Sequence, residues 1–203
     1  MRNEDLIAAP GEKEFSDALF ERLDLRDKAV TSREFHSCVF RGCDLTRASL
    51  VRSRFTGCRF ESCNLSLAKL PGSSFSSAVF RSSKLAGVNW TEAAWPRIKL
   101  PGQLSFEDCV LTDAVFLGLH LREASFLNCL AKGADFREAD LSGAALRGTD
   151  FSGALFGGTD LSGADLSLAR NYAIRPDENK LKNAVFSMPE AMALLYCMDI
   201  KIQ

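Results

Sequence analysis

The chain has 203 residues, of which 46% are hydrophobic and 25% are charged, and its formal net charge is −1. This length allows one ordinary domain or two small ones, and the near-zero charge excludes a strongly basic nucleic-acid-binding protein. No apolar run approaches the roughly 20 residues of a membrane span, and the charged start MRNEDLIAAPGEKE has no signal-peptide core. We therefore expect a cytoplasmic protein that is not bound to a membrane.

From Phe15 to Leu100, an apolar residue recurs at every fifth position. A helix repeats every 3.6 residues and a strand every 2, so neither explains this period. From Phe35 to Phe80 the recurring residues run Phe, Phe, Leu, Leu, which is a longer period of twenty. A backbone that turns a corner every five residues and closes after four sides has both periods, with coils stacked about 4.8 Å apart. Residues 1–14 precede the pattern and are expected to cap the first coil.

The position two residues before each recurring apolar residue is almost always small. In an extended segment, residues two apart share a face, so both point into the tube. These positions include Cys38, Cys58, Ala68, Ala114 and Ala134. The pattern predicts an all-β solenoid, a right-handed quadrilateral β-helix filled by its own side chains, over residues 15–186.

One extra residue between Leu100 and Phe106, in LPGQLSF, shifts the frame and predicts a break near residues 101–105. Because the frame runs without interruption to Leu100 and the break adds only one residue, we expect no long loop in the first stretch and at most a bend between two stacks. The pattern then continues from Phe106 to Leu166.

Charge is distributed unevenly along the predicted rod. Residues 1–101 contain 16 Lys and Arg against 12 Asp and Glu, whereas residues 102–170 contain 5 and 10. Five aspartates in the second part directly precede a recurring apolar residue: Asp135, Asp140, Asp150, Asp160 and Asp165. As an outward acidic face they would imitate the phosphates of DNA; alternatively, each carboxylate bonds the backbone of its own turn.

The period fails over residues 171–179, in NYAIRPDEN, which reads as a loop, and Leu181 and Phe186 restore it. Residues 187–203 are predicted to contain a C-terminal helix, with Ser187 as N-cap and Glu190 three residues later. This helix caps its own tube or also joins a second copy of the chain. The apolar residues assigned to that dimer interface are Ala191, Leu194, Leu195 and Met198.

The sequence contains no recognisable catalytic or metal-binding motif. Cys38, Cys43, Cys58 and Cys63 have the spacing C-x4-C-x14-C-x4-C, unlike the close pairs of structural zinc sites, and they occupy small inward positions. The two histidines lie far apart, and a tube filled by its own side chains leaves no substrate cleft. We expect no enzyme activity, no metal and no cofactor.

The repeated units, such as ADLSG and ADFRE, resemble those of the pentapeptide-repeat family over about residues 15–186. The break LPGQLSFEDC, the tail NKLKNAVFSMPEAMALL and the segment GVNW are more closely similar to the Qnr-like and microcin-immunity group. That resemblance implies a homodimer joined through the C-terminal ends. It also implies a non-catalytic DNA mimic that binds DNA gyrase and topoisomerase IV, without binding nucleic acid itself, and protects them from quinolones or a natural toxin. The alternative is an interaction scaffold with an unrelated partner, because fold alone does not give function.

Overall fold

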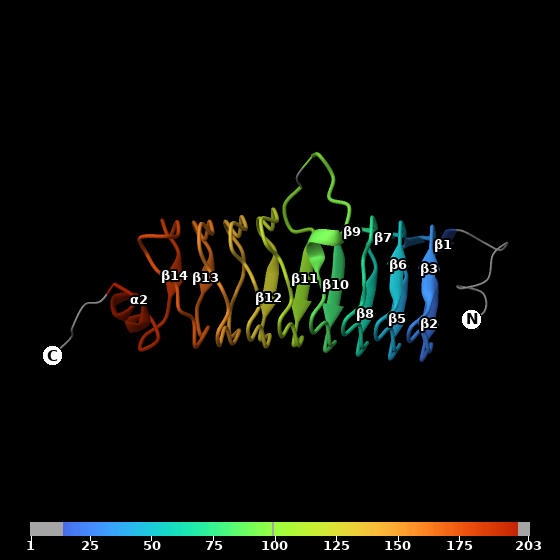
Figure 1. The fold of residues 1–203 in the computed structure, drawn as a ribbon, viewed down its shortest axis with the longest axis horizontal. Helices are drawn as coiled ribbons and strands as arrows, with labels where there is room; N and C mark the ends of the chain where they lie inside the picture. The colour runs from blue at the N-terminus through green and yellow to red at the C-terminus, as the bar shows by residue number, and fades with distance from the viewer. Residues whose placement is uncertain (1–13, 99, 199–203) are drawn as a thin grey trace.

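The computed structural model describes residues 14–98 and 100–198, which form a rod of stacked coils with the first coil and the C-terminal helix at opposite ends (Figure 1). The rod is a parallel β-solenoid of about nine turns with one short α-helix, so the predicted right-handed quadrilateral β-helix is confirmed. The predicted cap over residues 1–14 lies outside the described residues, apart from Glu14.

The strands are short because each side of a coil has room for only three or four extended residues. Before the break they are β1 (Glu14–Ser16), β2 (Leu19–Glu21), β3 (Ala29–Thr31), β4 (Glu34–His36), β5 (Val39–Arg41), β6 (Ser49–Val51), β7 (Arg54–Thr56), β8 (Arg59–Glu61), β9 (Ser74–Ser76) and β10 (Ala78–Arg81). The 3-10 helix η1 (Trp90–Glu92) also precedes the break. After the break come β11 (Leu104–Glu107), β12 (Ser125–Leu127), β13 (Asp165–Leu166), β14 (Val185–Phe186) and the helix α2 (Met192–Tyr196).

Strands of successive coils pair in parallel along the rod. One sheet has the order β1-β4-β7-β9 and another the order β2-β5-β8-β10-β11-β12, while β3-β6 and β13-β14 form two-stranded sheets. Phe35 pairs with Phe55 and Phe55 with Phe75. Their rings stack at centroid distances of 4.9 and 5.0 Å, which confirms the predicted column.

The core is one continuous cluster that runs along the axis of the rod. Identical side chains in successive coils occupy identical surroundings, which allows close packing without voids. The stacked cysteines are buried in this cluster, as expected for small inward residues. Burial raises the pKa of the Cys58 thiol to about 12, so at neutral pH it is an unreactive core residue.

The coils satisfy the carbonyl of the central apolar residue in two ways. At turn-type corners the backbone N–H three residues later donates to it, as from Ala134 to Ala131 at 3.2 Å. At strand-type corners the central residue lies in the parallel pairing with the next coil, and a side chain of that coil often donates to its carbonyl as well: the Cys58 thiol reaches the carbonyl of Phe35 at 3.3 Å, and the Ser83 hydroxyl reaches that of Phe60 at 3.2 Å.

The break differs from the prediction. Stacked side chains lie 20 residues apart in the first coils, as for Arg41 and Glu61, but 26 apart across the break, as for Arg81 and Glu107. The chain therefore contains six residues more than the coil needs, not one, and a segment between η1 and β11 projects from the rod (Figure 1). Leu100, expected in the core, is 59% exposed, while Leu104 is buried.

The C-terminal end also differs from the prediction. Tyr172 and Ile174, inside the predicted loop 171–179, are buried and complete the core. Helix α2 is only five residues long, and its N-cap is Ala191 without a side-chain hydrogen bond. Ser187 does not cap the helix, because its hydroxyl accepts from the backbone N–H of Leu168 at 3.1 Å and so continues the solenoid.

Candidate partner-binding surface

The interior of the rod offers no place for chemistry. The buried cluster fills it from Phe15 to Ile174. Within residues 14–98 and 100–198, no group of three or more His, Cys, Asp or Glu side chains is placed to hold a metal ion. Among these residues there is also no helix long and apolar enough to cross a membrane. Any binding function must therefore use the outer surface.

The five predicted aspartates do not form one acidic face. A spacing of five residues advances the chain by one side of the coil, so successive carboxylates wind around the rod. Only Asp140 and Asp160 stack on each other, in a row that begins with His120 and ends with Lys180. Asp135, Asp150 and Asp165 fall in three other rows, and each has an apolar stacked neighbour. Asp135 lies between Val115 and Leu155, Asp150 lies next to Leu130, and Asp165 lies next to Ala145.

Each of these carboxylates bonds the backbone of its own turn. One side-chain oxygen accepts from the N–H two residues later, at 2.9–3.1 Å, which is the Asx-turn alternative raised by the sequence. The donors are the backbone N–H groups of Arg137, Ser142, Ser152, Ser162 and Ser167. The second oxygen of each carboxylate is left for contacts outside the turn.

Most of these second oxygens face a basic side chain. Asp135 pairs with Arg137 at 2.7 Å, Asp150 with Arg170 at 3.2 Å, Asp160 with Lys180 at 3.1 Å and Asp165 with Arg147 at 3.8 Å, while the His120 imidazole lies 3.7 Å from Asp140. The hydrogen bond from Arg137 lowers the pKa of Asp135, and that from Ser167 lowers the pKa of Asp165. The basic neighbours therefore partly neutralise the negative charge around these aspartates.

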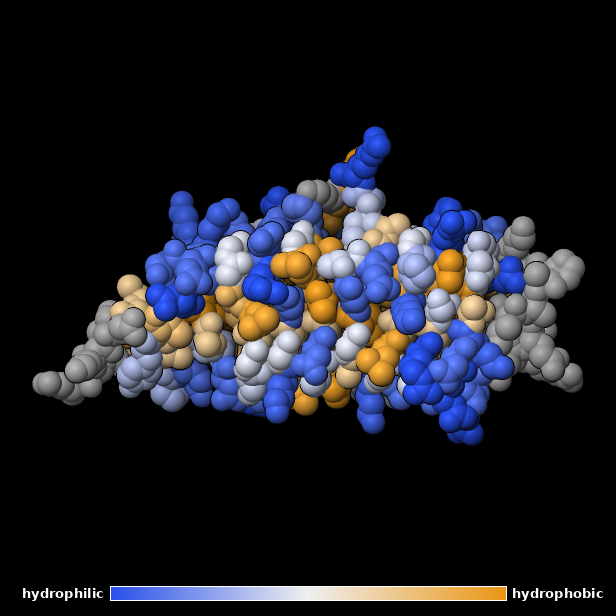
Figure 2. All heavy atoms as spheres, viewed as in Figure 1, coloured by the Kyte–Doolittle hydropathy of each residue, from blue (hydrophilic) through white to orange (hydrophobic). Residues whose placement is uncertain are grey.

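The first coils present a different charge pattern. Glu21, Arg41 and Glu61 alternate up one side of the rod, with Arg41 bridging the two glutamates at 3.2 and 3.0 Å. Arg81 and Glu107 continue the ladder at 2.9 Å across the break. The face of the rod drawn in Figure 2 has polar residues along both long edges and apolar residues gathered along its middle.

The residues predicted for a dimer interface divide into two groups at the C-terminal end. Leu194 packs against the core of the rod, and Ala191 is half-buried. Leu195 and Met198 are 38% and 45% exposed, next to the more exposed Tyr196. The end of the rod therefore carries apolar side chains at the surface of the described chain.

Two family models match the chain: "Pentapeptide repeat region" over residues 33–104 and "Pentapeptide repeats (8 copies)" over residues 134–170. Together the matched residues make up more than half of the sequence. With the period of five, the four-sided coil and the filled core, they show that the chain belongs to the pentapeptide-repeat family.

Among solved structures, the chain is similar to QnrB1, a plasmid-mediated fluoroquinolone resistance protein. A trypsin-treated variant matches with a TM-score of 0.70 and 19% identity, covering 94% of this chain and 90% of that one. The full-length protein matches with a TM-score of 0.60 and 21% identity, covering 92% and 90%. At this identity the likeness shows the fold. A search of the curated proteins finds no match.

Proposed function

We propose that the chain is a non-catalytic protein that binds a type II topoisomerase, DNA gyrase or topoisomerase IV, and protects it from quinolones or a natural gyrase toxin. The observation that supports this most is the match to QnrB1, a fluoroquinolone resistance protein, over nearly the full length of both chains. The filled core agrees with it, because a tube whose axis is occupied by its own side chains can bind a large protein only through its surface.

The surface supports an imitation of DNA in one restricted place. The part with excess acid, residues 102–170, contains the stacked pair Asp140 and Asp160. Their side chains are 28% and 25% exposed, and the turns fix their positions. Carboxylates held about 5 Å apart along an axis present charge at a regular spacing, whereas the phosphates of DNA are denser. The imitation is therefore partial, and we assign the main acidic contact to this row.

Two copies of the chain would join at their C-terminal ends. Leu195, Tyr196 and Met198 expose apolar surface there, next to Val185 and Met188. Burying such side chains between two copies removes them from water, at about 25 cal/mol per Å² of apolar area. A dimer of this kind places the two acidic parts near the centre of a long rod. Sedimentation of the full chain and of a Leu195→Glu variant tests it: the variant is expected to be monomeric.

The protection experiment is a gyrase supercoiling assay with and without a quinolone, titrated with the full chain. We expect the chain to restore supercoiling in the presence of drug. The double variant Asp140→Asn, Asp160→Asn should lose much of this effect. The matched control is Asp24→Asn, Asp44→Asn, which removes the same charge from a stacked pair in the first coils. Absence of any effect of the chain at saturation would contradict the proposal.

The scaffold alternative has one specific observation in its favour. Every predicted aspartate already has a local hydrogen-bond partner, so none needs a basic partner protein to be satisfied. If affinity capture with the full chain returns a reproducible partner that is not a topoisomerase subunit, and the two double variants behave alike, the scaffold function is favoured.

A further inference from the structure

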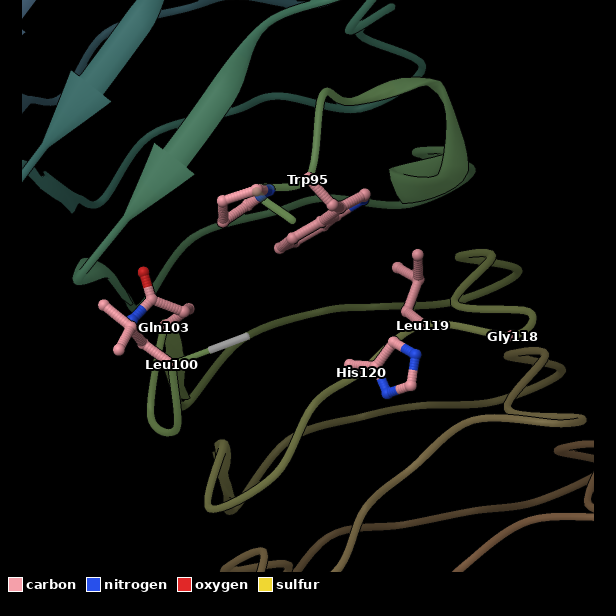
Figure 3. A pocket seen from close by; sticks show the side chains of 7 residues that line it. Trp95, Leu100, Gln103, Gly118, Leu119 and His120 are labelled. Atoms are coloured by element: carbon pink, nitrogen blue, oxygen red, sulfur yellow. The ribbon is translucent and has the colours of Figure 1, made fainter. Parts of the chain in front are cut away.

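A cavity of about 180 Å³ lies between the projecting segment and the coil that follows it. The segment contributes Trp95, Leu100 and Gln103, and the coil contributes Leu119 and His120. Figure 3 shows Trp95 on one side of this space, with Leu119 and His120 across from it and Gln103 and Leu100 at one end. The cavity is a consequence of the insertion, which lifts the chain away from the side of the coil that it would otherwise cover.

Leu119 is an exception to the repeat. It occupies the small inward position, which is Ala in neighbouring units such as Ala114 and Ala124. Its side chain is 8% exposed and lines the cavity. A leucine fits here because the six extra residues leave room that an ordinary coil lacks. The side chain therefore supplies an apolar wall of the cavity.

Trp95 supplies a flat wall opposite. Its indole Nε1–H donates to the carbonyl of Trp90 at 3.0 Å, which fixes the plane of the ring. Gln103 supplies the polar group: its Nε2 donates to the carbonyl of Pro101 at 3.4 Å, which leaves its side-chain oxygen as an acceptor. Among the described residues no hydrogen bond to that oxygen is present. The site thus combines a flat apolar slot with one hydrogen-bond acceptor.

We propose that this cavity binds a small planar aromatic molecule of one or two fused rings that carries an N–H group. The ring would lie between Trp95 and Leu119, and its N–H would donate to the side-chain oxygen of Gln103. An apolar cavity of roughly 150 Å³ is sufficient to hold benzene, so the volume here limits the ligand to this size. The site adjoins the row of Asp140 and Asp160 through His120, but binding of the aromatic molecule does not depend on the proposed topoisomerase contact.

The experiment uses indole as the probe with the full chain. Binding is followed by calorimetry and by the NMR signals of the indole N–H groups of Trp95 and Trp90, the two tryptophans of the sequence. A ligand of this size is expected to bind one to one with a Kd of about 1 mM or below. The Trp95 signal should shift in proportion to occupancy.

The blocking variant is Gly118→Asn. Gly118 lines the cavity at φ +66°, and a Cβ added there meets no atom within 4 Å, so the new side chain occupies open space. Asparagine accepts this backbone conformation, as Asn128 shows at φ 52°. The matched control is Gly153→Asn, a position with the same φ and equally open surroundings. We expect at least tenfold weaker binding for the first variant and unchanged binding for the second.

The proposal is overturned if indole shows no saturable binding, or if the two glycine variants weaken binding equally. A second probe, 1-methylindole, keeps the rings but lacks the N–H donor. It should bind at least about fivefold more weakly, the size of one lost hydrogen bond. Equal affinity for both probes would overturn the role assigned to Gln103.

Discussion

The coils before the projecting segment and those after it differ in their central residues and in the groups that donate hydrogen bonds to the carbonyls of those residues. In the first coils half of the central residues are Phe, and cysteine or serine side chains of the next coil donate to the carbonyls of most of these. In the later coils most central carbonyls accept a backbone N–H from the same turn, and the small position is mostly Ala or Thr. The comparison teaches that one five-residue period accommodates strand-type and turn-type corners, with most of the cysteine and serine donors in the first coils.

The largest effect is expected from the phenylalanine column of the first coils. Phe55 is 2% exposed and stacks between Phe35 and Phe75. Phe55→Ala should lower the free energy of unfolding by about 3–5 kcal/mol, because it leaves a cavity in a tube that cannot collapse. Urea unfolding followed by circular dichroism measures this. Phe55→Leu, which places a common central residue there, should cost less than about 1.5 kcal/mol; equal losses for both variants would contradict the column packing.

The next effect tests the side-chain donors that distinguish the first coils. Cys58→Ala removes the thiol that reaches the carbonyl of Phe35, a carbonyl that lies in the parallel pairing of β4 with β7, and so removes one hydrogen bond to a buried acceptor. The expected loss is about 0.5–1.5 kcal/mol in free energy of unfolding. Cys58→Ser keeps a donor and should recover most of it. If the alanine and serine variants are equally stable in urea, the side-chain donors do not stabilise these corners.

A smaller effect on stability is expected when the pH is lowered, through the carboxylate of Asp150 in the later coils. Burial raises the pKa of Asp150, but hydrogen bonds from Ser152, Asn171 and Arg170 outweigh it and lower the pKa to about 2. A carboxyl whose pKa falls on folding stabilises the folded state above the unfolded pKa, about 4, and loses that contribution as the pH drops to about 2. Asp150→Asn should remove about 1 kcal/mol of this pH dependence, after allowance for screening by solvent.

The measurement is the free energy of unfolding between pH 5 and pH 2 for the parent and the Asp150→Asn chain. The difference between the two should shrink as the pH falls. A constant difference over the whole range would show that the hydrogen bonds to Asp150 do not depend on its charge.

The smallest effect on stability is expected from deletion of residues 96–100 together with Gln103. The deletion restores the spacing of 20 residues between Phe80 and the residue that stacks on it, and it leaves Trp95, Pro101 and Gly102 at one corner. The deletion is combined with Leu119→Ala, because the restored coil has no room for a leucine at the small position. Because the cost of loop closure depends only weakly on length, stability should then change by about 1 kcal/mol or less. Thermal unfolding and indole binding are measured together: the chain should remain folded and lose the binding.

The core could be predicted closely because the period of five places each residue on the inside or the outside of the tube. The prediction placed the five aspartates on one face because it used only their common position within the five-residue unit. It did not take into account which of the four sides of the coil each unit forms. Counting in steps of twenty separates Asp135, Asp150 and Asp165 from the stacked pair. The partners of these carboxylates, such as Lys180 for Asp160, follow from the same count.

The sequence pattern located the break near residues 101–105 but predicted one extra residue where the structure has six. Five extra residues leave the five-residue period in register, so only the sixth extra residue shifts the frame. The signal that reveals the insertion is the longer period: after Phe60 and Phe80 the next phenylalanine of that column is Phe106 rather than residue 100. Leu100 fits the short period and is nonetheless at the surface.

The sequence by itself determined that the chain closes into four-sided coils, which side chains fill them, and that residues such as Phe35 and Phe55 stack. It could do so because these properties repeat in every unit and need only local information. The tertiary structure decided how the six extra residues leave the rod and that Trp95 faces Leu119 across a cavity. These depend on contacts between the inserted segment and the coil that follows it, which lie outside the repeat and which the repeat does not encode.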